Sequence, residues 1–385
     1  MNQGRTVGLL YGHCLDVGGV ESHLLALMSR CDRARWSWRI LAPTSAAFSA
    51  RAAEAFADVE HWAPRHALDA AALRSLVRST RARPLDVLHV HDPRVLPIAQ
   101  AAAAHLRLPL VYTVHLPVAG PGGMGSRTRR RLYGTAERIL LRLSPPARVV
   151  HVSARALAQA AFRSNGRVVF VPNGVDLGRA PAPGARARVR AALGVPADAC
   201  VVTSVARLVP QKGLDVLLEA WAQAGGGGGS SYLWLAGDGP AQAALEAARL
   251  RLGLAGRVTL LGRRDDVPDL LAATDVFVLA SRAETTPIAL LEAMAAGVAS
   301  IATDVGDCGA MLGDGAAGRV VAPGDVAGLA AALREVVSDR ALRERLGVAA
   351  RERARLFDDV SMAERTAAVY ETALDRRARA TAEAG

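Results

Sequence analysis

The sequence is poor in several residue types, and each shortage excludes a class of protein. Only 4% of its 385 residues are aromatic, so its cores must be built from alanine, leucine and valine. The four cysteines, Cys14, Cys31, Cys200 and Cys308, form no Cys-x-x-Cys pair and have no histidine at zinc-ligand spacing. These scattered cysteines predict neither a disulfide framework nor a zinc site, and they favour a reducing compartment.

Long apolar runs are also missing. No run approaches the roughly 20 residues that a membrane-spanning helix needs. Residues 1–5 lead directly into a short strand-like run, Val7–Tyr11, rather than into the apolar segment of a signal peptide. We therefore expect a cytoplasmic protein. Because 51% of the residues are hydrophobic, a chain of this length can bury two cores, and we expect two domains.

Lysine is almost absent, since Lys212 is the only lysine among 47 basic residues. This preference for arginine over lysine is of the kind that the base composition of a genome produces. At Lys212, however, a compact ammonium group stands where this chain would otherwise use arginine. The count alone does not distinguish a functional role of Lys212 from neutral drift at a surface position. The surrounding motif must decide between these two interpretations.

The formal net charge of +11 is concentrated in the first half of the chain. Residues 1–180 contain 24 arginines and 11 acidic residues, a net charge of +13, which leaves 23 basic and 25 acidic residues, or −2, for 181–385. A nearly neutral second half argues against general nucleic-acid binding. The basic half predicts an anionic partner, which could be a membrane surface, a phosphorylated acceptor or a nucleotide diphosphate.

Short β-rich apolar runs alternate with helical stretches along the whole chain. This alternation predicts an α/β protein with parallel sheets, built from two Rossmann-like domains. We expect a first domain over 1–180, a second over 181–358 and a C-terminal segment, 359–385, that is helical to about Leu374. A five-glycine run, 225–229, predicts a mobile surface loop.

Three motifs lie where strands of such domains end. The first, Asp16-Val-Gly-Gly-Val-Glu21, follows the first strand and opens a helix. Adjacent glycines let the backbone approach a ligand, and a helix N-terminus offers N–H groups to an anion. The motif predicts a phosphate contact at Gly18 and Gly19, although an ordinary strand-to-helix turn would show the same residues.

The second motif, Val205-Ala-Arg-Leu-Val-Pro-Gln-Lys-Gly213, follows the first strand of the second domain. Arg207 leaves the carboxyl end of that strand, and Lys212 closes the loop before the next helix. Ligands of open α/β sheets bind at these ends, and two cations beside a helix N-terminus suit a diphosphate. We interpret Arg207 and Lys212 as diphosphate ligands; the alternative is two solvated loop cations.

The third motif, Glu284-Thr-Thr-Pro-Ile-Ala-Leu-Leu-Glu292, places seven residues between two glutamates. Pro287 suits the first turn of a helix, so Glu284 precedes the helix and Glu292 lies on it. The neighbours of Glu292 are apolar, and a carboxylate there needs partners, which ribose hydroxyls would supply. The alternative is a surface glutamate on an amphipathic helix.

This third motif, followed by Ala293-Met-Ala-Ala-Gly297, resembles the retaining glycosyltransferases of the GT-B fold, family 4, also called glycosyl transferases group 1. The resemblance covers nearly the whole chain. Further segments stand in the family's order: Gly18-Gly19, Asp86-Val-Leu-His-Val-His91, Thr113-Val-His115, Val171-Pro-Asn-Gly-Val-Asp176, the Arg207/Lys212 loop, Leu235-Ala-Gly-Asp-Gly-Pro240, Leu261-Gly-Arg263, Ala322-Pro-Gly-Asp325 and the final helix.

The resemblance implies two Rossmann-like domains facing across a cleft, the first binding the acceptor and the second the nucleotide sugar, with the C-terminal helix crossing back onto the first. Arg207 and Lys212 would hold the diphosphate, Glu292 the ribose, and Glu284 the donor sugar, with His115 nearby. The implied catalytic residues are His115, Arg207, Lys212 and Glu284. The other implied donor-binding residues are Gly18, Gly19, Gly262, Arg263, Thr285, Thr286, Pro287, Ile288 and Glu292. The acceptor-side candidates are His91, His115, Arg127, Arg130 and Arg131.

Two departures from the family leave the donor sugar open. Thr285 stands where the family commonly has glycine, and Gly306-Asp307 stands where it often has two glycines. Both positions border the implied donor site. For the nucleotide, the resemblance favours UDP, then GDP. The acceptor would be a hydroxyl of a glycan, a glycolipid or a natural product.

The sequence contains no Asp-x-Asp, the pair that would hold Mg²⁺ or Mn²⁺ on a diphosphate. We therefore expect no metal and no cofactor, with Arg207, Lys212 and helix N-termini stabilising the leaving group. The resemblance implies retention at the anomeric carbon, by front-face attack in our hypothesis. A non-catalytic sugar-nucleotide-binding or scaffolding subunit is the alternative.

Residues 126–143 predict a basic amphipathic helix with six arginines and one glutamate. Such a helix could lie on anionic lipid and bring the enzyme to a lipid-linked acceptor at the inner face of the membrane. An ordinary core-packed helix with an arginine-rich solvent face is the favoured alternative in so arginine-rich a chain.

Overall fold

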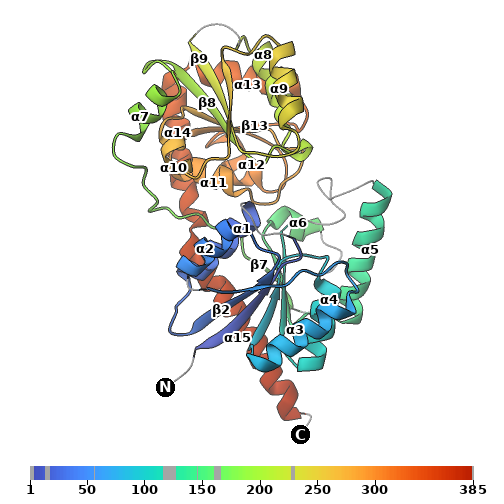
Figure 1. Cartoon of the computed structure of the whole chain (residues 1–385). Coiled ribbons are helices and arrows are strands. Elements are labelled where there is room, and N and C mark those ends of the chain that lie inside the picture. The colour runs from blue at the N-terminus through green and yellow to red at the C-terminus, as the bar shows by residue number, and fades with distance from the viewer. Residues whose placement is uncertain are drawn as a thin grey trace. The chain divides into compact units, whose positions relative to one another are not determined.

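The computed structural model describes residues 4–13, 18–55, 57–115, 127–144, 146–159, 166–226 and 230–383. It divides the chain into two compact units, the first formed by 1–174 and 359–385 and the second by 175–358 (Figure 1). The first unit ends before the boundary expected at 180. The reason is that Val175 already pairs with Asp358 and donates its backbone N–H to Phe357 O at 2.8 Å.

The first unit contains a seven-stranded parallel sheet in the order β3-β2-β1-β4-β5-β6-β7. Its strands are β1 (Arg5–Leu10), β2 (Trp36–Ala42), β3 (Ala57–His61), β4 (Val87–Val90), β5 (Leu110–Val114), β6 (Arg148–His151) and β7 (Val168–Phe170). Its helices are α1 (Gly19–Arg30), α2 (Ala46–Glu54), α3 (Ala70–Ala82), α4 (Leu96–Leu106), α5 (Arg127–Leu143), α6 (Ala154–Gln159) and α15 (Asp359–Glu383).

The C-terminal helix α15 is part of the core of the first unit. Helices α1, α2 and α15 cover one face of the sheet, while α3, α4 and α5 pack on the other. Tyr370 of α15 is fully buried, with its ring 5.2 Å from that of Trp36 and 6.2 Å from that of Trp38. The helix continues to Glu383, past the end expected near Leu374.

The second unit contains a six-stranded parallel sheet in the order β10-β9-β8-β11-β12-β13. Its strands are β8 (Cys200–Val205), β9 (Ser231–Ala236), β10 (Val258–Gly262), β11 (Val276–Leu279), β12 (Ala299–Thr303) and β13 (Arg319–Val321). Its helices are α7 (Ala185–Ala192), α8 (Leu214–Gln223), α9 (Gln242–Arg251), α10 (Val267–Ala272), α11 (Ile288–Ala295), α12 (Cys308–Met311), α13 (Val326–Ser338) and α14 (Arg340–Ala354), with 3₁₀ turns at Pro210–Lys212, Gly313–Gly315 and Arg355–Phe357.

Both sheets are doubly wound, and this topology positions the site residues. The strand order reverses between β1 and β4 in the first unit and between β8 and β11 in the second. At such a reversal the connecting loops leave in opposite directions and open a crevice at the carboxyl ends of the strands. The switch point therefore lies between the loops after β1 and β4 in the first unit and between those after β8 and β11 in the second.

The α/β class and the two Rossmann-like units expected from the sequence are confirmed. Among the described residues, no helix is long and apolar enough to cross a membrane. Most of the expected glycine run lies outside the described residues, which omit 227–229.

Candidate active site

Arg207 lies at the carboxyl end of β8 on a turn that rests against two glycines. A Cβ atom at Gly237 would lie 1.9 Å from Ala206 O, and one at Gly239 would lie 2.6 Å from Leu208 O, so only glycine permits this approach. The side chain of Arg207 is exposed and makes no hydrogen bond or ion pair with any residue that the structure describes. Its guanidinium is therefore available to an anion.

Lys212 is held by a second close approach, at the end of the same loop. Gly213 has a φ of +61°, and a Cβ there would lie 2.1 Å from Ala280 O, just beyond β11. Gln211 donates from Nε2 to Ala283 O at 2.9 Å, and Arg282 N donates to Gln211 O at 2.7 Å. These contacts fix the loop after β8 against the loop after β11.

The two loops bring Lys212 and Glu284 together. Lys212 Nζ donates to Glu284 Oε1 at 2.6 Å, and Ser281 Oγ donates to the same oxygen at 2.6 Å. The side chain of Glu284 is only 9% exposed and that of Lys212 22% exposed, so the pair is largely shielded from water. The one lysine of the chain is therefore paired with the first glutamate of the motif.

The turn after Glu284 is packed against the segment that follows β12. A Cβ at Gly306, whose φ is +53°, would lie 2.3 Å from Thr285 O, and Asp307 N donates to that oxygen at 2.8 Å. Thr286 Oγ1 lies 3.5 Å from Asp307 Oδ2 in a buried contact. Thr285 has no positive φ, so its backbone does not require the glycine that the family commonly has there.

Glu292 lies on α11, and Pro287 occupies the N-cap position immediately before that helix. The Glu292 carboxylate is 24% exposed and lies 3.7 Å from a guanidinium nitrogen of Arg179. At the end of β10, Gly262 adopts a φ of +64°, and the guanidinium of Arg263 lies 3.7 Å from the carboxylate of Asp265. The second unit thus holds all the predicted diphosphate, ribose and base-side residues apart from Gly18 and Gly19.

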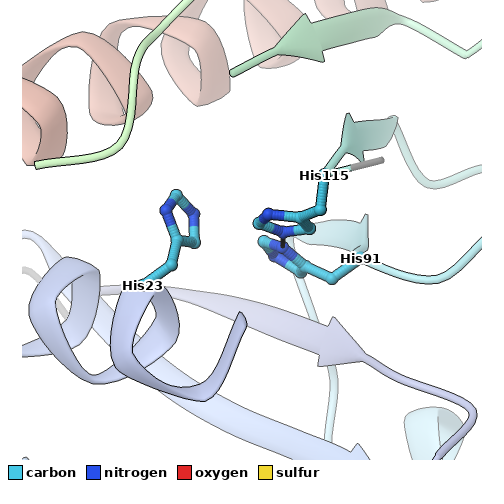
Figure 2. Close-up of side chains that lie close together, drawn as sticks. All are labelled: His23, His91 and His115. Carbon is cyan, nitrogen blue, oxygen red and sulfur yellow. Dashed lines mark hydrogen bonds between the residues drawn. The ribbon is translucent and has the colours of Figure 1, made fainter. Parts of the chain in front are cut away.

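In the first unit, His91 and His115 lie side by side, as Figure 2 shows. His91 follows β4, His115 follows β5, and His91 Nδ1 is 2.9 Å from His115 Nε2. His23, which the sequence did not single out, faces them from α1, its ring 4.9 Å from that of His115 and 5.6 Å from that of His91. In the sequence, the only feature that connects His23 with the predicted site is its position two residues after Glu21, the last residue of the glycine motif.

A fourth histidine, His89, packs behind this group. Its ring centroid is 4.0 Å from that of His91, its Nδ1 is 2.7 Å from Tyr370 Oη and its Nε2 is 2.7 Å from Thr113 Oγ1. Burial lowers the pKa of His23 to about 4, a shift that nearby Asn173 partly opposes. Burial also lowers the pKa of His89, His91 and His115 well below the ordinary value, so all four rings are neutral at pH 7.

The glycine loop of the first unit is described only in part, because Asp16 and Val17 lie outside the described residues. Gly18 is the extended N-cap of α1, and a Cβ there would lie 2.8 Å from Glu21 Oε2, whereas a Cβ at Gly19 would meet nothing within 4 Å. The side chains of Arg127, Arg130 and Arg131 also lie outside the described part of the chain, although their backbone belongs to α5.

Sequence comparison finds two matching family profiles that follow one another along the chain. The profile of "Glycosyltransferase Family 4" matches residues 17–179, and that of "Glycosyl transferases group 1" matches residues 185–353. The division between them lies within a few residues of the start of the second unit at Val175.

Individual relatives are also transferases by name. The chain is 31% identical to 2-deoxystreptamine glucosyltransferase of Streptomyces kanamyceticus over 283 residues, which cover 71% of this chain and 73% of that protein. It is 41% identical to lipopolysaccharide core biosynthesis glycosyltransferase LpsE of Rhizobium meliloti over 157 residues, only 41% of this chain and 45% of that protein.

Among solved structures, Anabaena HepE in complex with UDP-glucose has the same fold. Its TM-score is 0.84 at 24% sequence identity, and the alignment covers 95% of this chain and 99% of that one. Two doubly wound units, two consecutive family profiles and a relative aligned over most of its length lead to one assignment: the chain is a transferase that belongs to the group 1, or family 4, glycosyltransferases of the GT-B fold.

Proposed function

We propose that this enzyme transfers a hexose from a UDP-sugar, or in second place a GDP-sugar, to a hydroxyl group of a glycan, glycolipid or natural-product acceptor. The observation that carries the proposal is the uncommitted guanidinium of Arg207 on the same loop as Lys212, at the carboxyl end of β8. Two cations at the reversal of a doubly wound sheet suit a diphosphate. The second unit would bind the donor and the first unit the acceptor.

Donor binding would exchange the partner of Lys212. Its ammonium would move from Glu284 to the diphosphate, and Glu284, still held by Ser281 Oγ, would accept a hydroxyl of the donor sugar. The first backbone N–H groups of α11 have no partner within the helix and would bind further sugar oxygens. Glu292 would bind the ribose hydroxyls beside Arg179.

The reaction we propose retains the anomeric configuration. The bond between the anomeric carbon and the diphosphate oxygen breaks while the acceptor oxygen bonds to the same face of that carbon. The acceptor's proton passes to the leaving phosphate oxygen, and Arg207 and Lys212 stabilise the charge that develops there. These two cations would take the role that a metal ion has in enzymes with Asp-x-Asp, so we propose a metal-independent, cofactor-free enzyme.

The relatives support the class of donor and acceptor. HepE was solved with UDP-glucose, and LpsE is named for lipopolysaccharide core biosynthesis. For a lipid-linked acceptor, we propose a cytoplasmic enzyme that contacts the inner, anionic face of the membrane through α5. Its exposed Ile139 and Leu143 accompany the arginines of that helix. Flotation with vesicles containing anionic lipid at low salt tests this contact, and absence of binding would refute it.

Thermal-shift screening with UDP, GDP, ADP and their sugars tests the donor. A ligand at a hundredfold excess over its dissociation constant stabilises the fold by about 2.7 kcal/mol. We expect UDP and a UDP-hexose to give the largest shifts, and ¹H NMR of the product to show the donor's anomeric configuration. An inverted anomer would refute the mechanism, and absence of both donor hydrolysis and transfer with every sugar nucleotide would refute the proposed activity.

A further inference from the structure

Three histidines that are far apart in the sequence converge in the first unit. His23 comes from α1, His91 follows β4 and His115 follows β5, and one ring nitrogen of each lies within 4.8 Å of the others (Figure 2). They meet because β1, β4 and β5 are neighbouring parallel strands, whose carboxyl ends share one edge of the sheet. The cluster therefore follows from the fold.

Two of these rings carry buried nitrogens that lack hydrogen-bond geometry to the residues that the structure describes. Nε2 of His91 has no hydrogen-bond partner within the described ranges, and neither ring nitrogen of His23 meets hydrogen-bond geometry there, although the side chain of Asn173 lies close enough to raise the pKa of His23. The two residues are only 3% and 2% exposed. A buried polar atom without a partner costs about 1–3 kcal/mol, so these nitrogens indicate a ligand that they would bind.

Metal ions bind a neutral imidazole through its lone pair, and the three rings lie close enough for one ion to reach a nitrogen of each. His89 supports the cluster without joining it, since its two ring nitrogens are taken by Tyr370 and Thr113.

We propose that His23, His91 and His115 form a binding site for a divalent transition-metal ion, with Zn²⁺ as the preferred ion. Imidazole nitrogens suit Zn²⁺, whereas Mg²⁺ and Mn²⁺ prefer oxygen ligands, and no member of this trio offers a carboxylate. Three protein ligands leave the fourth position of a tetrahedral ion for water or an anion. The ion is separate from any metal that would bridge a diphosphate, and its binding does not depend on the transferase proposal.

Metal binding would have a consequence for transfer, which does rest on the proposed function. His115 cannot both coordinate the ion and contact the donor sugar. We therefore expect Zn²⁺ to inhibit transfer, and a chelator to restore it. Loss of activity alone would not identify the site, so binding must be measured directly.

The test uses full-length, tag-free protein that has been stripped of metal with a chelator. Zn²⁺ is titrated by calorimetry, and Co²⁺ by visible absorption, which reports tetrahedral coordination. We expect one ion per chain, and binding weakened at least about 100-fold by each of His23→Gln, His91→Gln and His115→Gln. His151→Gln is the matched control, because His151 is also buried with an unpaired ring nitrogen but lies outside the trio, and it should bind like the wild type.

Circular dichroism of each metal-free variant distinguishes loss of a ligand from loss of the fold. X-ray absorption at the zinc edge of the loaded wild-type protein identifies imidazole ligands without any substitution. Failure of the wild-type protein to bind one ion per chain, a spectrum without imidazole ligands, or equal loss of binding in His151→Gln would each overturn the proposal.

Discussion

Lys212 Nζ lies 2.6 Å from Glu284 Oε1, although the two residues are 72 positions apart in the chain. The contact depends on the loops after β8 and β11, which Gln211 and Gly213 join to Ala280 and Ala283. Glu284 thus holds the ammonium group at the carboxyl ends of β8 and β11. A diphosphate would then replace one carboxylate oxygen with a more highly charged partner.

Replacing Lys212 with alanine should therefore lower kcat/KM by about 100- to 1,000-fold, the loss typical of one preorganised electrostatic group. Lys212→Arg should recover only part of this loss, because a planar guanidinium cannot occupy the space of a compact ammonium. Steady-state transfer assays measure both variants. Arg340→Ala, which removes an exposed cation paired with Glu344, is the control and should leave kcat/KM unchanged. Full activity of Lys212→Ala would contradict the proposed role.

Asp307 is expected to affect which sugar is accepted. It is buried, its backbone N–H holds Thr285 O, and its carboxylate lies beside Thr286. Asp307→Gly, which restores the family's glycine, should change the ratio of kcat/KM between UDP-hexoses that differ at one hydroxyl, by about tenfold or more. Asp307→Asn keeps the volume and removes the charge, so it separates shape from charge. An unchanged ratio in both variants would show that Asp307 does not reach the sugar.

Much of the fold could be predicted because buried parallel strands have continuous apolar sequences. The strand-like run expected at Val7–Tyr11 is present as β1, Arg5–Leu10. The edge strand β3, Ala57–His61, gives no such signal, because its sequence ADVEH mixes polar and apolar residues and is only partly buried. Helix α15 is longer than expected because its last turns contain many arginines and alanines, which are good helix formers.

The site could be predicted only where residues belong to a local motif. Lys212 and Glu284 each stand in such a motif, but their pairing depends on the order of strands in the sheet, which spacing does not encode. His23 was missed for a similar reason, since it lies on a helix rather than at a strand end. Its proximity to His115 comes from the packing of α1 beside the β1, β4 and β5 edge.

Tyr370→Phe should destabilise the first unit. The substitution removes the hydroxyl that lies 2.7 Å from His89 Nδ1 and leaves that buried nitrogen without a partner. The expected cost is about 1–3 kcal/mol, visible as a lower unfolding midpoint in urea. Tyr232→Phe is the matched control, because Tyr232 lies in the second unit and its ring is covered by Arg257. Equal midpoints for Tyr370→Phe and the wild type would contradict the importance of this hydrogen bond.

Acid should destabilise the first unit through its buried histidines. In the unfolded chain His23 binds a proton near its ordinary pKa of 6.5, whereas in the folded protein burial lowers that pKa to about 4. The unfolded state therefore binds more protons between these two values, and stability falls as the pH falls from 6.5 towards 4. Each such histidine contributes up to about 1.4 kcal/mol per pH unit in this range.

The buried carboxyl of Asp92 acts in the opposite direction, because its folded pKa is raised to about 6 from an ordinary value of 3.8, so its contribution falls as the pH rises through that interval. Burial raises the pKa of Glu137 as well, so this carboxyl acts in the same direction as Asp92. The buried histidines outnumber these two carboxyls, and the net stability should still decline in acid. Melting temperatures of the metal-free protein between pH 5 and pH 7.5 measure the effect. His23→Gln should make the profile flatter, because glutamine does not titrate. A wild-type profile that is flat below pH 6.5 would contradict the neutral state of these rings.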